Sequence, residues 1–300
     1  MRSLALIFSF IVGSIFYESL TPLRWVIPYS IGMMLFLTFV GVEKEKLKPH
    51  RLHVKLLIGI QISGFIFWLI PSLLGYPILA ESMFYCAAAP IAAAAPIIIS
   101  ILKGKVEFIT TALLLSQFIF ALLMPIVLPF IVPGSHASYW DISSTVFLQL
   151  FQVIICPAVL ALIVRCIYPK SITWRGKTSN LALGLWVFNL CVITGSSVTN
   201  IIAFNYSLMD MLPFVLASAL ICAVGFTVGY QLGKPDYAVE FSQGLGQKNT
   251  LLTLLIASQE YSTPIACIGP TFYIIFHNIA NAIQVAIASH KEKKSQKQTS

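Results

Sequence analysis

Runs of about 20 apolar residues recur along almost the whole chain, separated by short joints. A helix of that length spans the hydrocarbon core of a bilayer, which is about 30 Å thick. Only 10% of the 300 residues are charged, against about 25% in soluble domains. The sequence therefore predicts an all-α polytopic membrane protein with no large soluble domain. About ten spanning helices are expected, over residues 2–18, 22–42, 54–74, 79–101, 107–132, 143–168, 180–204, 211–232, 237–258 and 264–289.

Lysine and arginine alternate between the joints. They gather after the second, fourth, sixth and eighth runs and at the C-terminal end, and they are absent after the third, fifth, seventh and ninth runs. Basic loops stay in the cytoplasm, so we expect a multi-pass protein of the cell membrane with both termini cytoplasmic. Arg24, after the first run, is an exception. Because the basic residues follow this pattern, the net charge of +8 does not indicate nucleic-acid binding.

Five runs in each half of the chain would make the second half enter the membrane from the opposite side. The first repeat is then expected over 1–142 and the second, inverted, over 143–289, an architecture that many secondary transporters use. Residues 290–300 are expected to form a disordered, basic cytoplasmic tail.

The fourth run of each half contains residues that break a helix. In the first half these are Pro90 and Pro96, which remove backbone donors and clash with the preceding turn. In the second half they are Gly244 and Gly246, which weaken the helix. We expect two discontinuous helices that cross, with free backbone groups for a ligand, and the alanines around Pro90 would allow close packing.

Lys248 is the basic residue that we place deepest in the membrane, beside Gln247 and Asn249. A lysine there costs about 2.5–3.5 kcal/mol on insertion scales, which favours a functional role over a snorkelling or structurally paired side chain. Glu240 lies about 12 Å away along an intact helix and is expected at the interface. His277 is either a proton shuttle or a satisfied core histidine. The six cysteines lack metal-ligand spacing and are interpreted as packing residues.

Several segments together resemble the bile acid/sodium symporter superfamily, whose relatives include arsenite-efflux permeases. The similarity covers most of the chain in layout, and the chain would be a divergent member of bacterial type, in the cell inner membrane. The residues that support it are Gly32-Met33-Met34, Gln61, the segment from Ala89-Pro90 to Lys103-Gly104, Ser116, Met124-Pro125, Pro157, Gly246-Gln247-Lys248-Asn249 and His277-Asn278.

The resemblance implies a panel domain and a core domain, with the fourth and ninth helices crossing in the core beside two sodium ions. It implies an organic anion as substrate, moving between the domains. At two positions where the family has a serine and an asparagine, this chain has Ala95 and Pro96. The family's glutamate is replaced by Gly244 and its glutamine by Lys248. We therefore hypothesise that the Lys248 ammonium replaces a sodium ion, held by Asn249, Gln61 and carbonyls.

The expected function is secondary active transport of a small organic anion by alternating access. It would be sodium-independent or proton-coupled, since burial disfavours a charged lysine, and Na⁺ or H⁺ are the candidate coupling ions. The alternative is a non-transporting membrane sensor or scaffold. An enzyme is not expected, because the sequence has no His/Glu metal motif, no Gly-x-Ser-x-Gly and no phosphate-binding loop. The expected partners are the anion and the lipid bilayer, and no nucleic acid is expected. The protein is expected to be a monomer or a homodimer.

Overall fold

A computed structural model describes residues 2–42, 47–132, 137–174, 179–203 and 205–299. Within these ranges every regular element is helical. Seven helical stretches in the described ranges are long and apolar enough to cross a membrane. They are Tyr17–Val40, Arg51–Leu73, Val106–Ile131, Tyr139–Ile167, Leu181–Ala203, Leu208–Leu232 and Pro264–Ala288. The chain is an all-α, multi-pass membrane protein, as the hydropathy predicts.

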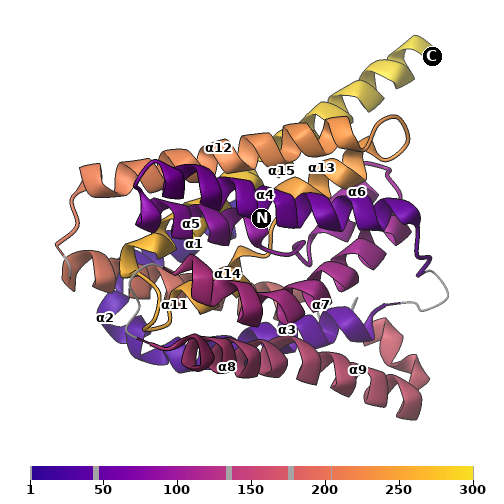
Figure 1. The fold of residues 1–300 in the computed structure, drawn as a ribbon. Coiled ribbons are helices and arrows are strands. Elements are labelled where there is room, and N and C mark those ends of the chain that lie inside the picture. Colours follow the sequence, from indigo (N-terminus) through magenta and orange to yellow (C-terminus); the bar gives the residue numbers. More distant parts are fainter. Residues whose placement is uncertain (1, 43–46, 133–136, 175–178, 204, 300) are drawn as a thin grey trace.

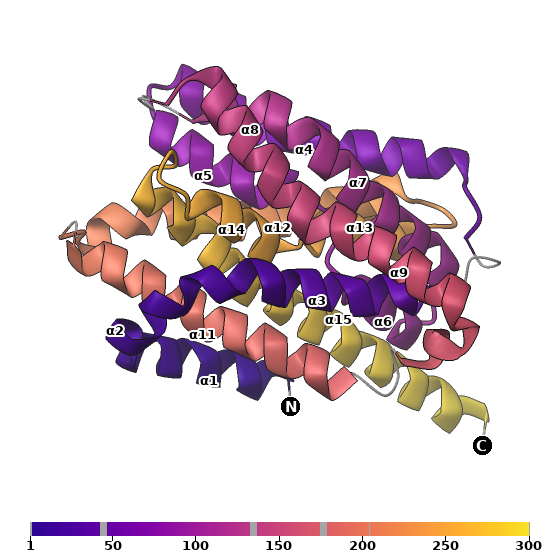
Figure 2. The ribbon, with the colours of Figure 1, turned by 90° about the horizontal axis from the view of Figure 1, so that it is seen from below.

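One set of helices, linked by contacts to one another, is called the α11 group after its longest member. Its members are α1 (Arg2–Ile15), α2 (Tyr17–Leu20), the 3₁₀ segment η1 (Thr21–Val26), α3 (Ile27–Val40), α8 (Tyr139–Leu150), the π-helical η3 (Phe151–Ile155), α9 (Cys156–Ile167), η4 (Pro169–Thr173) and α11 (Ser179–Ala203). In this group α1, α2 and α3 contact α11, and α3 also contacts α9 (Figure 2).

The remaining helices form a second set, called the α12 group (Figure 1). Its members are α4 (Arg51–Leu73), α5 (Pro77–Ala88), α6 (Ala95–Ile101), α7 (Val106–Ile131), α12 (Leu208–Leu232), α13 (Ala238–Gly246), α14 (Thr250–Ala257), η5 (Pro264–Cys267) and α15 (Ile268–Thr299). Helices α7 and α14 contact the α11 group. Each group takes helices from both halves of the sequence.

Four apolar clusters lie inside the described residues, and the two with the most members are called the larger and the smaller core. The larger one joins α14 and the C-terminal part of α7 to α3, α8 and α11. The smaller one joins α13 and the N-terminal part of α7 to α4 and α6. The outer face is also apolar: Leu73, Leu208 and Ile167 are each at least 78% exposed. A soluble protein would not tolerate such a surface, whereas lipid covers it at no cost.

Side-chain caps set several helix ends that hydropathy alone misplaces. Helix α4 begins at Arg51, three residues before the expected start, because His50 accepts a hydrogen bond from the Leu52 N–H. Helix α8 begins at Tyr139 instead of 143, because Ser138 and Asp141 form a capping box. Polar residues at a cap therefore extend these helices beyond their apolar runs.

Close contact between α12 and α13 depends on glycines. Gly225 and Gly229 of α12 and Gly233 at its C-terminal cap recur at every fourth residue, so they share one face. A β-carbon added at Gly225 would lie 2.7 Å from the Leu245 oxygen, and one at Gly229 would overlap the Phe241 carbonyl. The backbones can approach this closely only because all three residues lack a side chain.

The C-terminal end differs from the sequence-based expectation. Residues 290–300 were expected to be disordered, but α15 continues as a helix to Thr299 and projects beyond the bundle (Figure 1). Lysine, glutamate and glutamine, which dominate this segment, are good helix formers. Extending an existing helix also avoids the cost of nucleation, which explains why the helix does not stop at the membrane.

Candidate functional site at two interrupted helices

The helix expected over 79–101 is interrupted in its middle. Helix α5 ends at Ala88, and α6 begins only at Ala95. Pro90 has no N–H with which to continue α5, and Pro96 lies in the first turn of α6, where a missing donor is harmless. The two prolines thus end one helix and start the next, leaving a short non-helical segment between them.

The helix expected over 237–258 is interrupted as well. Helix α13 ends at Gly246, and α14 begins at Thr250. A β-carbon at Gly246 would overlap the Phe226 ring of α12, and one at Gly244 would lie 2.8 Å from a methyl group of Leu56 in α4. The glycines therefore make room for neighbouring helices, in addition to weakening α13.

The two interruptions lie against each other. Ile91 and Lys248 form a single antiparallel β-bridge. The Ala92 N–H donates to the Gln247 oxygen at 2.9 Å, and the Asn249 N–H donates to the Pro90 oxygen at 2.7 Å. Backbone groups that the broken helices leave free are thus paired across the crossing, which a membrane interior requires.

Side chains from other helices complete this pairing. Ser116 of α7 accepts from the Ile91 N–H at 3.1 Å, and the Gln117 amide donates to the Ile91 oxygen at 3.0 Å. Tyr273 of α15 donates its hydroxyl to the Gly246 oxygen at 2.8 Å. Helices α7 and α15 therefore hold the crossing from both sides.

Lys248 is buried at this crossing, with 2% of its surface exposed. Its Nζ has no hydrogen-bond partner among the described residues, and neither has Oε1 of Gln247 or Nδ1 of His277. Helices α5 and α13 both end at the crossing, and the C-terminal end of a helix favours a positive charge. An unpaired amine in this position can bind a proton or an anionic group.

The structure brings together most of the residues that the sequence singles out. Pro90, Ser116, Gly246, Gln247, Lys248 and Asn249 meet at the crossing through the bonds above, and Gly244 and Pro96 lie one turn away or less on α13 and α6. Asn249 contributes its backbone N–H, and in the described part of the chain neither its side chain nor that of Gln61 is bonded to Lys248.

Three other expected residues have local roles. The Asn278 amide donates to the Ile274 oxygen of its own helix at 2.7 Å, which is an intrahelical bond. His277 packs edge-on against Tyr273, with ring centroids 5.7 Å apart. The Glu240 carboxylate accepts from the Lys105 N–H at the start of α7, so Glu240 ties α13 to that helix instead of pairing with Lys248.

The sequence analysis missed a second buried polar cluster, around Glu81 in α5. Its side chain is fully buried, and Oε1 accepts from the Thr263 N–H at 3.1 Å and from the Tyr85 hydroxyl at 3.2 Å. The Tyr85 hydroxyl also lies 2.6 Å from the Ser262 hydroxyl. An acidic residue inside an expected spanning run was a visible signal for this cluster.

No protein-family model matches the chain, and no curated protein matches it either. Of the residues described, no group of three or more His, Cys, Asp or Glu is arranged to hold a metal ion. The fold and site define an integral membrane protein whose centre is a contact between two interrupted helices.

Proposed function

We propose that this protein is a secondary active transporter that moves a small organic anion across the membrane by alternating access. The proposal includes membership of the bile acid/sodium symporter superfamily. The observation that supports it most is Lys248, a buried and unpaired amine at the point where two interrupted helices meet. Interrupted helices near the middle of the membrane are a recurrent construction of substrate and ion sites in transporters.

The arrangement of the helices supports an inverted repeat of five spanning segments. The interrupted pairs α5–α6 and α13–α14 correspond to the fourth segment of each half. Two groups of helices, each taking members from both halves, suit a mechanism in which one group moves against the other. The α11 group would correspond to the panel domain of the family and the α12 group to its core domain.

In this proposal, the Lys248 ammonium occupies the position of a coupling sodium ion. It supplies a fixed positive charge at the crossing, beside the C-terminal ends of α5 and α13. An intrinsic charge removes the need for external sodium. Burial makes the uncharged form of an amine easier to reach than it is in water. Loss and gain of a proton by Lys248 would then couple transport to H⁺.

The test compares the wild type with Lys248→Gln in proteoliposomes. The wild type should take up radiolabelled small carboxylates without sodium, and Lys248→Gln should take them up only with sodium, if at all. Thermal melting should show stabilisation of Lys248→Gln by sodium chloride over choline chloride, and none for the wild type. Lys170→Gln, which removes an exposed lysine of η4, should behave as the wild type.

Two results would contradict parts of this proposal. If sodium stabilises the wild type, a sodium site is intact and Lys248 does not replace the ion. If carboxylates stabilise the wild type but no uptake or exchange occurs, the protein is a non-transporting sensor or scaffold.

A further inference from the structure

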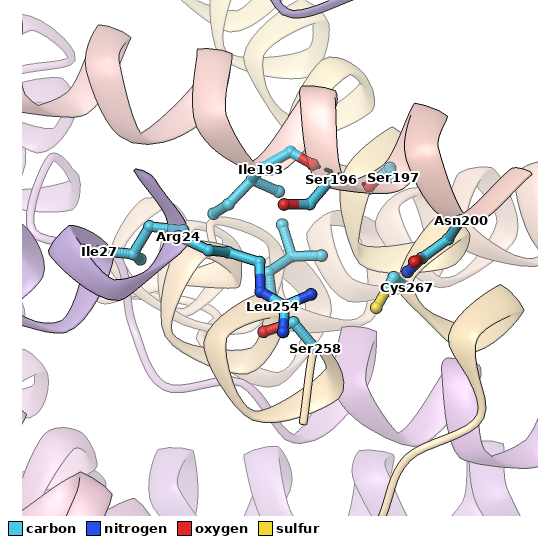
Figure 3. Close-up of a pocket in the computed structure, with 9 residues that line it drawn as sticks. All are labelled: Arg24, Ile27, Ile193, Ser196, Ser197, Asn200, Leu254, Ser258 and Cys267. Carbon is cyan, nitrogen blue, oxygen red and sulfur yellow. Dashed lines mark hydrogen bonds between the residues drawn. The ribbon is translucent and has the colours of Figure 1, made fainter. Parts of the chain in front are cut away.

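A small pocket lies between the two helix groups, away from the crossing (Figure 3). Its lining comes from η1, the first residue of α3 and α11 on one side, and from α14 with its C-terminal cap and η5 on the other. The lining residues are Arg24, Ile27, Ile193, Ser196, Ser197, Asn200, Leu254, Ser258 and Cys267. The enclosed space is about 10 Å³, which is room for one water molecule or one carboxylate oxygen.

The charge in this pocket is positive. Arg24 extends its guanidinium from η1 into the space between α11 and α14 (Figure 3). Of the described residues that line the pocket, none is acidic, and no salt bridge to Arg24 is found in the described part of the chain. The floor is apolar, since Ile27, Ile193 and Leu254 are buried. An arginine beside an apolar floor binds an anion more strongly than one that is fully hydrated.

Further hydrogen-bond donors face the same space. Ser196 is 94% buried, because only 6% of its surface is exposed, and its hydroxyl has no partner among the described residues. The side chains of Ser196 and Asn200 point from α11 toward the pocket (Figure 3). A buried hydroxyl without a partner is costly unless a ligand or water satisfies it. Together with Arg24, these groups can donate to both oxygens of one carboxylate.

The position of Arg24 in the sequence is also unusual. It follows the first apolar run, on the side of the membrane where the other joints have no Lys or Arg. Asn200 and Ser258 lie next to two of those joints, so the pocket opens on the side opposite the basic loops. Arg24 therefore departs from the alternation of basic and non-basic joints, and its side chain lies in a pocket.

We propose that this pocket is an outer recognition site for the carboxylate of the transported anion, with Arg24, Ser196 and Asn200 as donors. The inference rests on the proposed transport function and adds to it the residues that first bind the carboxylate and the point at which the anion enters. One carboxylate oxygen occupies the enclosed space, and the rest of the anion lies outside, where Arg24 is exposed. Because the lining comes from both helix groups, a movement between them changes the site.

The experiment measures thermal melting of the full chain in nanodiscs of phosphatidylcholine, titrated with the choline salts of formate, acetate and benzoate. We expect carboxylates to stabilise the wild type, with an affinity that falls about tenfold or more in Arg24→Gln. Asn200→Asp adds a negative charge to the pocket lining, and it should lose the response while remaining folded. Arg165→Gln removes an arginine of α9 outside the pocket and should respond as the wild type.

Arg24→Lys provides a variant that keeps the charge and is expected to fold. It should bind carboxylates less tightly than the wild type, because lysine lacks the planar fork of donors. If Arg24→Gln and Asn200→Asp respond as the wild type does, the anion binds elsewhere and the pocket proposal is wrong, while transport itself is untouched.

Two further outcomes would overturn the pocket proposal. One is an Arg24-dependent stabilisation by phosphatidylglycerol in the nanodiscs with no response to carboxylates, which would assign the pocket to a lipid headgroup. The other is the absence of any carboxylate response in the wild type. Uptake assays on the wild type in proteoliposomes then decide separately whether the transport function itself is correct.

Discussion

Replacing Lys248 by methionine should stabilise the folded protein while it removes the proposed function. The lysine is 2% exposed, and its amine has no hydrogen-bond partner among the described residues. Methionine has a similar unbranched stem, so it can occupy the same space without the amine. Most substitutions of buried residues destabilise a protein, so a gain in stability would be a distinctive result.

The expected change in the free energy of unfolding of Lys248→Met follows from two contributions. A buried polar group without a partner costs about 1–3 kcal/mol, which the substitution recovers. A swap between side chains of similar volume costs less than about 1.5 kcal/mol. Taking the middle of both ranges, the free energy of unfolding should therefore rise by about 1 kcal/mol. Natural functional sites often trade stability for activity in this way.

Unfolding in mixed micelles, followed by tryptophan fluorescence, measures this free energy. The matched control is Lys55→Met, because the Lys55 ammonium donates to the Leu232 oxygen at 2.8 Å. That variant loses a bond and should be slightly less stable than the wild type. If Lys248→Met is destabilised as much as Lys55→Met, the buried amine has partners, and its proposed role as a free charge is wrong.

Two further predictions concern stability. Gly229→Ala should destabilise the protein by about 1–3 kcal/mol, because the new methyl group overlaps the Phe241 carbonyl. Gly184→Ala, with no atom within 4 Å of the new methyl group, should be neutral or stabilising. Equal melting temperatures of these two variants would refute the close α12–α13 contact. Glu81→Ala should lower the free energy of unfolding by about 1–3 kcal/mol, because the Thr263 N–H loses its acceptor. Glu81→Gln keeps an acceptor oxygen and should retain most of the stability. An equal loss of stability in both variants would show that the charge of Glu81 matters.

The sequence predicted seven of the ten expected spanning segments, which the described residues form as long apolar helices, and the place of both interruptions, because these depend on local chemistry. Hydropathy marks each run, and Pro90, Gly244 and Gly246 mark the breaks whatever the rest of the fold is. Lys248 was identifiable for the same reason, since a charge inside an apolar run is unusual by itself.

The partners at the crossing were less predictable. Gln117 looks like any polar residue of a spanning run, and only its donation to Ile91 gives it a role. The Arg24 pocket joins residues from four distant segments, which no local pattern connects. The inverted repeat and the family resemblance remain predictions, because neither the helix boundaries nor the comparisons test them.

Helix α7 connects the two apolar cores and contributes side chains to both. Its polar pair Ser116 and Gln117 lies between its buried contributions to the smaller core, which end at Leu113, and those to the larger core, which begin at Phe120. Leu114 packs against both cores. This pair binds the backbone of Ile91 at the boundary. A rotation of α7 would therefore change the packing of both cores at once.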